Sequence, residues 1–384
     1  MRKLIGIIAS GSIGRDPYDK RSWSGCSRFF FSACSKAGIL ERAFGTEAPY
    51  YQKVPLMLKN YAIKKNIWRE KFYLDTEYYH ALTNAIKKKI RYSDYLCDFI
   101  QIGAIYNVPS ILQGRAKCYS YHDGILLQKI KSPYFPKAIP DKVIYAALDY
   151  EECVYQAMNK IFTMSEYLRK SFIHDLKIPP AKVAHIGGGI NFDIPPPRNL
   201  KKRYDQKNIL FVGLNFLRKG GFLLLKAFSV IRDVYPGASL TIIGHSQLNV
   251  DERLTRGVRL LGFLDRSDPY QNQIYEKAFD NASILVMPSI YEPFGFAPLE
   301  AMVHEIPCIL TNRWAFPEFI TPGEEGELVE CENVDELIEK IIALLKNPDQ
   351  LAVMGEKARL KVLKNYTWER VANNLAKEMN QTIL

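Results

Sequence analysis

The chain has 384 residues, of which 47% are hydrophobic, as expected for a globular protein of two domains. Its seven Cys include no C-x-x-C pair and are odd in number, so free thiols in a reducing cytoplasm are expected rather than a disulfide framework. No apolar run approaches the ~18 residues of a membrane span. The first nine residues contain too few apolar side chains for the core of a signal peptide, so we expect a cytoplasmic protein.

The positive charge of the chain is concentrated in its first half. Residues 1–200 carry 30 Lys and Arg against 17 Asp and Glu, a net charge of +13. Residues 201–384 carry 22 against 24, a net charge of −2. This asymmetry predicts two domains with different binding partners.

Short apolar runs in the first half indicate buried strands. The expected strands are residues 4–9, 98–102, 117–121, 160–163 and 183–186. A long loop, residues 11–25, follows the first of them and begins with Gly11. The pattern predicts a parallel sheet with a glycine-containing loop after its first strand.

Two basic stretches with aromatic residues, 59–69 and 85–92, lie between the first two of these strands. They could contact an anionic bilayer, a phosphorylated acceptor or nucleic acid, and a solvated basic helix face explains the same residues. Neither has the aromatic spacing of a platform for single-stranded nucleic acid, and we expect no nucleic-acid partner. The densest lysines are Lys64, Lys65, Lys87, Lys88 and Lys89.

His122 ends one of the expected strands, in the polar triplet His-Asp-Gly. A lone histidine is more often structural than catalytic. At the carboxyl edge of a parallel strand, however, it is also placed to take part in proton transfer.

The segment 193–202 is rich in proline and charge and poor in periodicity, so we place a domain boundary there. Beyond it, strands and helices alternate, which predicts βαβ units and a second parallel sheet. The expected strands are 208–212, 239–243, 258–261, 284–287 and 307–310, and the expected helices are 222–231, 335–345 and the tail from Trp368. The predicted domains are residues 1–195 and 205–365, with a last helical segment at 366–384.

Residues 213–221, GLNFLRKGG, join the first strand of the second half to its first helix. Their glycines permit close backbone approach, while Arg218 can bind an anion bidentately and Lys219 as a point charge. The loop is a plausible diphosphate site, although it does not match G-x-G-x-x-G and basic turns are common.

The stretch SIYEPFGFAPLEAM holds two glutamates eight residues apart, Glu292 and Glu300. Glu292 follows an expected strand, and we place Glu300 in the first turn of the next helix, which begins after Gly295. That edge of an α/β sheet binds ligands, and the unpaired N–H groups of a helix start favour phosphates or hydroxyl oxygens. A surface loop whose Glu300 complements the helix dipole is the alternative.

Glu292-x7-Glu300, with Pro-Phe-Gly after the first glutamate, resembles the hallmark of family 4 retaining glycosyltransferases. The resemblance covers most of the chain beyond about residue 90. It implies the GT-B fold, an α/β architecture of two Rossmann-like doubly wound parallel sheets facing across a cleft. The first domain would bind the acceptor and the second the nucleotide sugar, and the C-terminal helix would cross back onto the first domain.

By this resemblance, Glu292 and the backbone of Phe294, Gly295 and Phe296 hold the donor sugar, and Glu300 binds the ribose of the nucleotide. Arg218 and Lys219 neutralise the diphosphate. His122 resembles a histidine near the reacting carbon, and Gly11 is the best match in the amino-terminal loop, which here is longer and lacks a Gly-Gly pair.

The expected function is transfer of a hexosyl unit from a UDP-, GDP- or ADP-sugar to a sugar, glycan or lipid-linked acceptor. The reaction is expected to need no metal ion and to retain the configuration of the sugar. The protein could also contact the inner face of the membrane peripherally. No D-x-D or His/Asp cluster suggests a metal site. Alternatives are a GT-B relative such as a sugar-nucleotide epimerase or a phosphorylase, and a non-enzymatic nucleotide- or RNA-binding protein. A glycosidase could use both glutamates but would have no use for Arg218 and Lys219.

Overall fold

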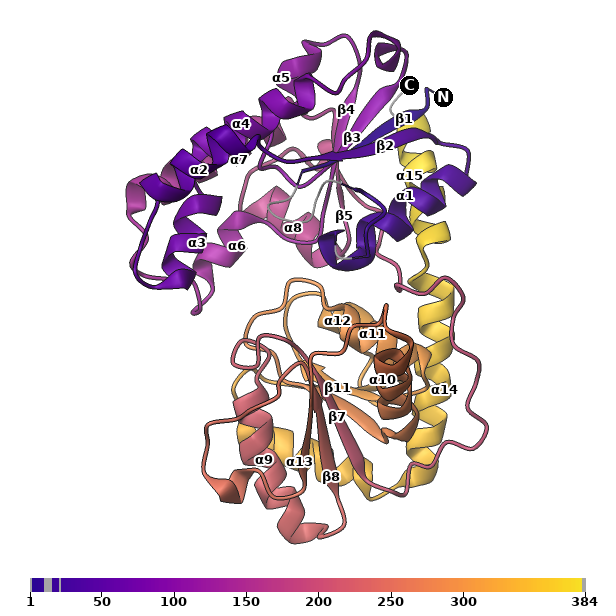
Figure 1. Ribbon diagram of the computed structural model, residues 1–384. Helices are drawn as coiled ribbons and strands as arrows, with labels where there is room; N and C mark the ends of the chain where they lie inside the picture. The colour runs from indigo at the N-terminus through magenta and orange to yellow at the C-terminus, as the bar shows by residue number, and fades with distance from the viewer. Residues whose placement is uncertain (1, 10–15, 21, 382–384) are drawn as a thin grey trace. The chain divides into compact units, whose positions relative to one another are not determined.

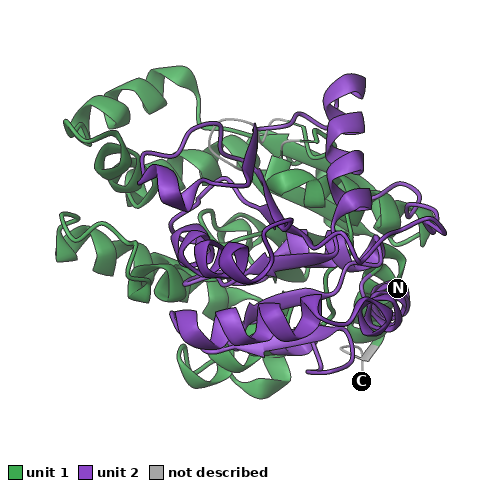
Figure 2. Cartoon of the chain, turned by 90° about the horizontal axis from the view of Figure 1, so that it is seen from below, with its two compact units in different colours: residues 1–191, 367–384 green, residues 192–366 purple. Residues whose placement is uncertain are grey.

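The computed structural model describes residues 2–9, 16–20 and 22–381. The chain divides into two compact units (Figure 2). Unit 1 consists of Met1–Asn191 and Thr367–Leu384, and unit 2 of Phe192–Tyr366.

Unit 1 is built on a six-stranded parallel sheet with the order β2-β1-β3-β4-β5-β6 (Figure 1). The strands are β1 (Leu4–Ala9), β2 (Leu40–Thr46), β3 (Asp98–Ile102), β4 (Cys118–His122), β5 (Lys160–Thr163) and β6 (Val183–His185). All residues of β1, β3 and β4 are buried, as is typical of the central strands of a parallel sheet. The predicted strands are confirmed, but β2 was missed because the exposed Glu41 and the partly exposed Arg42 interrupt the apolar pattern of this edge strand.

Helices surround this sheet, and short 3-10 turns connect several of them. The helices are α1 (Cys26–Lys36), α2 (Tyr50–Lys59), α3 (Lys65–Tyr73), α4 (Thr76–Lys87), α5 (Val108–Leu112), α6 (Leu126–Lys131), α7 (Asp141–Ala157), α8 (Glu166–His174) and α15 (Trp368–Gln381), and the 3-10 turns are η1 (Ser22–Gly25), η2 (Tyr92–Leu96) and η3 (Pro180–Lys182). Helices α2 to α4 form an insertion between β2 and β3, in the part of the first half where we had expected no strand.

Helix α4 separates the two basic stretches of the insertion. At its start, Asn60 Nδ2 donates to Asp75 Oδ2 at 2.6 Å, and just past its end Lys89 Nζ donates to the Gly45 carbonyl at 2.6 Å. Its 12 residues span about 18 Å at 1.5 Å per residue. Asn60 and Lys89, one from each stretch, are therefore held near opposite ends of this helix.

The C-terminal helix α15 packs on unit 1 alongside α1 (Figure 1). Its buried side chains recur with helical spacing at Trp368, Val371, Ala372, Leu375 and Met379. The Trp368 ring lies 6.1 Å from the Phe30 ring, and its Nε1 donates to Asn191 Oδ1 at 3.1 Å. The last segment of the chain thus completes the core of the first unit.

Unit 2 carries a second six-stranded parallel sheet, with the order β12-β11-β10-β7-β8-β9. Its strands are β7 (Asn208–Val212), β8 (Ser239–Ile243), β9 (Val258–Gly262), β10 (Ile284–Met287), β11 (Cys308–Thr311) and β12 (Gly326–Val329). The winding of the chain reverses between β7 and β10. Ligands of such sheets bind at the carboxyl ends of the strands beside this switch point, so we call this side of unit 2 its ligand edge.

Helices flank the second sheet as well. They are α9 (Gly221–Val234), α10 (Pro269–Asn281), α11 (Phe296–Val303), α12 (Phe316–Phe319), α13 (Val334–Leu345) and α14 (Pro348–Asn365), with the 3-10 turn η4 (Glu252–Leu254). Within residues 2–9, 16–20 and 22–381, no helix combines the length and the apolar character that crossing a bilayer requires.

Trp368→Ala should lower the free energy of unfolding by about 3–5 kcal/mol, because the side chain is only 4% exposed and its removal leaves a cavity between α15 and α1. Urea denaturation measures the effect. Tyr92→Ala is the control, since Tyr92 is 93% exposed and should cost less than about 0.5 kcal/mol. Equal effects of the two substitutions would show that α15 contributes nothing to the stability of unit 1.

Candidate active site

Two loops meet at the switch point of unit 2, one after β7 and one after β10. The carbonyl oxygen of Arg218, in the first loop, accepts hydrogen bonds from the backbone N–H groups of Ile290 at 2.9 Å and Tyr291 at 3.3 Å. Gly220, with a φ of 75°, lies so close to Pro288 that a Cβ would stand 2.0 Å from the Pro288 carbonyl oxygen. Only glycine permits this approach, so the backbones of the loops are locked together.

The side chain of Lys219 lies across Gly213, where a Cβ would stand 2.3 Å from the lysine Cδ. Along this path its Nζ reaches Glu292 Oε2 at 2.9 Å. Arg218 approaches the same oxygen with Nη2 at 3.4 Å, while its Nη1 donates to the Tyr291 carbonyl at 2.6 Å. Three residues singled out by the sequence for the diphosphate and the sugar thus form one charge cluster.

Glu292 is ionised at neutral pH although it is buried. Burial by itself raises the pKa of its carboxyl, but the attraction of Lys219 and then of Arg218 outweighs burial and holds the pKa below its usual value. The cluster therefore has one carboxylate and two cations, with a net charge of +1. Because the carboxylate fixes the cations, they do not have to be ordered when an anion arrives.

Glu300 lies in the second turn of α11, not in the first as predicted, because the helix begins at Phe296 and Glu300 is its fifth residue. Its carboxylate is buried and held at both oxygens. Oε1 accepts a hydrogen bond from Arg266 Nη1 at 2.9 Å, and Oε2 accepts one from the Tyr275 hydroxyl at 2.6 Å. Each oxygen keeps a further lone pair that can accept a hydrogen bond from a ligand hydroxyl.

Arg266 and Tyr275 were missed by sequence analysis. Arg266 follows β9, so its place after an expected strand of the second sheet is a signal that could have drawn attention to it. Tyr275 carries no such signal, because it lies in the middle of α10 and reaches Glu300 only through the packing of α10 beside α11. The Arg266 guanidinium lies 4.8 Å from the Tyr275 ring centroid, so the two residues support each other as well as Glu300.

The backbone between the two glutamates is placed to contact a ligand, whereas the Phe294 ring is not. Phe294 is 2% exposed, and its ring lies 5.1 Å from that of Phe296 and 5.2 Å from that of Phe319. No side chain caps the start of α11, which follows Gly295. The first N–H groups of this helix therefore remain candidates for ligand oxygens.

The sequence points to two candidate residues in the first domain, Gly11 and His122. Gly11 lies outside the described residues. His122 ends β4, as expected, but its ring is 3% exposed and lies 5.4 Å from the Tyr155 ring and 5.3 Å from the Phe172 ring. Burial lowers the pKa of His122 to about 3, so the ring is neutral at physiological pH.

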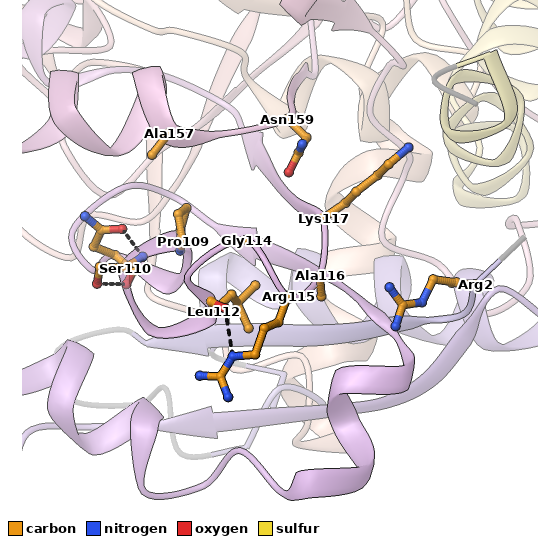
Figure 3. A pocket seen from close by; sticks show the side chains of 11 residues that line it. Arg2, Pro109, Ser110, Leu112, Gly114, Arg115, Ala116, Lys117, Ala157 and Asn159 are labelled. Carbon is orange, nitrogen blue, oxygen red and sulfur yellow. Dashed lines mark hydrogen bonds between the residues drawn. The ribbon is translucent and has the colours of Figure 1, made fainter. Parts of the chain in front are cut away.

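A cavity of about 480 Å³ in unit 1 lies at the other end of the strands (Figure 3). Its lining includes Arg2, Arg115, Lys117 and Asn159, which precede β1, β4 and β5. The Arg115 Nε donates to the Leu112 carbonyl at 3.2 Å. Since the cavity lies where the strands begin, it is separate from the candidate residues, which lie where the strands end.

All seven cysteines are free, as predicted. Cys308, in β11, is the one nearest in sequence to the glutamate motif, and burial raises its pKa, so it is not poised as a thiolate nucleophile. In the part of the chain that the structure describes, no group of three His, Cys, Asp or Glu is arranged to hold a metal ion.

Comparison with known proteins relates this site to one family. Residues 196–361 match the family model described as glycosyl transferases group 1. An uncharacterized glycosyltransferase of Methanocaldococcus jannaschii is 28% identical over 241 residues, which cover 58% of this chain and 58% of the relative. The chain thus spans somewhat more than half the length of that relative.

Several solved structures resemble the fold of this chain over almost its whole length. Sucrose-phosphate synthase from Thermosynechococcus elongatus has a TM-score of 0.73 at 18% identity, covering 100% of this chain and 99% of that one. HepE of Anabaena in complex with UDP has a TM-score of 0.61 at 15% identity, covering 99% and 100%. These likenesses confirm the predicted two-domain α/β fold class, GT-B.

Lys219→Met should lower the free energy of unfolding by about 3 kcal/mol at pH 7, because it leaves the buried Glu292 carboxylate with only the more distant Arg218. Adding Glu292→Gln should restore most of this loss, since the substitution removes the buried charge. Urea denaturation of the two variants measures both effects.

Lys357→Met is the matched control for Lys219→Met. Lys357 pairs with Glu324 at 3.1 Å on the surface, where the two side chains are 44% and 52% exposed, and such pairs contribute about 0–1 kcal/mol. If Lys219→Met costs no more than this control, the cluster does not hold the loops in place.

Proposed function

We propose that this chain transfers a hexosyl unit from a nucleotide-sugar donor to a sugar, glycan or lipid-linked acceptor, because residues 196–361 match the family model described as glycosyl transferases group 1. The observation that carries the proposal is the charge cluster of Glu292, Lys219 and Arg218 at the switch point of unit 2. A binding site for a neutral ligand would not need two fixed cations there.

Each part of the donor has a matching group in unit 2. The two further lone pairs of the Glu300 carboxylate suit the vicinal hydroxyls of a ribose, and Arg266 and Tyr275 fix the orientation of that carboxylate. Arg218 and Lys219 suit the diphosphate. Glu292, with the backbone at residues 294–296, suits the sugar hydroxyls.

The cluster also suits the departure of the nucleoside diphosphate. Negative charge grows on the diphosphate as the glycosidic bond breaks, and Lys219 and Arg218, already held in place by Glu292, can stabilise it with little reorganisation. We infer that these cations, rather than a metal ion, meet this charge. We also propose that the reaction retains the configuration of the sugar, as the glutamate motif implies.

Unit 1 is proposed to bind the acceptor, because its excess of positive charge suits an anionic or phosphorylated molecule.

We propose that His122 takes part as a neutral hydrogen-bonding group. A group with a pKa of about 3 carries no charge at neutral pH, so it would act by hydrogen bonding through Nε2, which has no hydrogen-bond partner among the described residues.

A panel of UDP-, GDP- and ADP-sugars tests the function. We expect slow hydrolysis of at least one member, faster turnover with a suitable acceptor, and no loss of activity in EDTA. Hydrolysis of none would favour a non-enzymatic nucleotide- or RNA-binding protein. Isomerisation of the donor sugar would favour an epimerase, and release of a sugar phosphate in the presence of inorganic phosphate would favour a phosphorylase.

Glu300→Ala should lower the affinity for the matching nucleoside diphosphate at least tenfold, because hydrogen bonds to a charged group contribute about 1.5–3 kcal/mol each. Isothermal calorimetry measures the change. Glu300→Gln keeps an oxygen for Arg266 and guards against a folding defect. Glu324→Ala, at an exposed glutamate of the same unit, should leave the affinity for the nucleoside diphosphate unchanged. Equal affinities of all variants would show that Glu300 does not contact the nucleotide.

We further propose that unit 1 contacts an anionic membrane through the turn between α2 and α3. Three large apolar side chains are exposed there, Leu58 at 71%, Tyr61 at 62% and Ile63 at 93%, beside Lys64 and Lys65. Exposed apolar and aromatic side chains flanked by lysines suit the boundary between lipid headgroups and acyl chains.

Lys64→Ala with Lys65→Ala should weaken co-sedimentation of the full chain with vesicles of phosphatidylcholine and phosphatidylserine by about 30-fold, since each lysine near such a surface contributes about 1 kcal/mol. Lys87→Ala with Lys88→Ala is the matched control at the far end of α4. Equal binding to neutral phosphatidylcholine vesicles, or an equal loss in the control, would contradict the proposed contact.

A further inference from the structure

The loop after β11 also lies at the ligand edge of unit 2. Strand β11 lies beside β10 in the sheet. The hydroxyl of Thr311, which ends β11, donates to the Ser289 carbonyl at 2.8 Å, and the Arg313 N–H donates to the Thr311 carbonyl at 2.7 Å. The loop is therefore fastened to the one that carries Glu292.

Trp314, in this loop, has a left-handed backbone with a φ of 57°. A bulky residue in this region is a genuine outlier, whereas glycine or asparagine adopts it with less strain. The other described non-glycine residues of unit 2 with positive φ are Lys207, Glu305 and Glu332, and none of them is aromatic. The turn itself therefore does not account for a tryptophan at this position.

The Trp314 ring is half-buried, so core packing does not account for it either. It stands edge-on to Tyr291, with ring centroids 6.0 Å apart and an interplanar angle of 84°. The Arg218 guanidinium carbon in turn lies 5.9 Å from the Tyr291 ring centroid. Trp314, Tyr291 and Arg218 thus form a continuous row beside Glu292, and part of its outermost ring remains open to a ligand.

We propose that Trp314 presents its indole to the glycosyl unit of the donor and helps to decide which sugar the site accepts. This inference rests on the proposed function. A sugar ring has an apolar C–H face and a hydroxyl-bearing rim, so it needs an apolar platform beside polar groups that orient it. Trp314 would supply the platform, and the neighbouring Glu292 would supply the polar contact.

The location of Trp314 separates its effect on the sugar from any effect on the nucleotide. The nucleotide contacts are assigned to Glu300, Arg218 and Lys219, whereas the Trp314 ring packs against that of Tyr291. Loss of the indole should therefore weaken recognition of the sugar and leave the affinity for the free nucleoside diphosphate unchanged. A merely structural tryptophan would affect stability, nucleotide affinity and turnover together.

The test uses the full chain and the nucleotide sugar that it hydrolyses fastest among UDP-glucose, UDP-galactose, UDP-N-acetylglucosamine, GDP-mannose and ADP-glucose. In Trp314→Gly, kcat/KM should fall by at least about tenfold. The Kd of the matching nucleoside diphosphate should stay within about twofold, and Tm should stay the same or rise because the backbone strain is relieved. Trp314→Phe should keep kcat/KM within about threefold, because an aromatic platform remains.

Glu332→Gly is the matched control, since Glu332 is exposed and has a φ of 63°, far along the chain from the glutamate motif. It should change Tm as Trp314→Gly does and leave kcat/KM unaltered. An unchanged kcat/KM in Trp314→Gly, or a joint loss of Tm, nucleotide affinity and turnover, would overturn the assignment of Trp314 alone. Absence of wild-type turnover with all five sugars would instead overturn the proposed function, and this inference with it.

Discussion

The ion pair of Glu292 with Lys219 and Arg218 joins the loops after β7 and β10, and the ligand edge of unit 2 depends on it. A buried carboxylate is costly unless a cation lies close to it, and here two cations lower its pKa against the effect of burial. The same pairing holds both cations in place before any ligand binds. A fixed positive site of this kind suits a leaving group whose negative charge grows during the reaction.

The second carboxylate of the motif is held in another way. Glu300 is fixed by one cation, Arg266, and one hydroxyl, Tyr275, which come from the segment after β9 and from α10. Three strand–helix connections of unit 2, after β7, β9 and β10, together with helix α10, thus converge on two glutamates that are eight residues apart in the sequence. This convergence explains why a short motif can organise a site that draws on most of the unit.

Unit 1 depends on segments from both ends of the chain. Its sheet is completed on one side by α15, a helix from the end of the chain, so the stability of the first unit depends on residues that follow the second. Its basic residues are dispersed over an insertion, in which the stretch at 59–69 precedes α4 and the stretch at 85–92 lies at the C-terminal end of that helix.

The sequence by itself determined every strand except β2 and β12, which lie at the edges of the two sheets, because the apolar runs of the other strands are local patterns. It also determined the charge asymmetry and the candidate residues Glu292, Glu300, Arg218 and Lys219, which lie at or near strand ends. Only the tertiary structure decided that Lys219 crosses Gly213 to reach Glu292, that Arg266 and Tyr275 hold Glu300, and that the His122 ring is enclosed by aromatic residues. These contacts join residues tens of positions apart. They depend on strand order, on the reversal of winding at β7 and on side-chain direction, which no local pattern encodes.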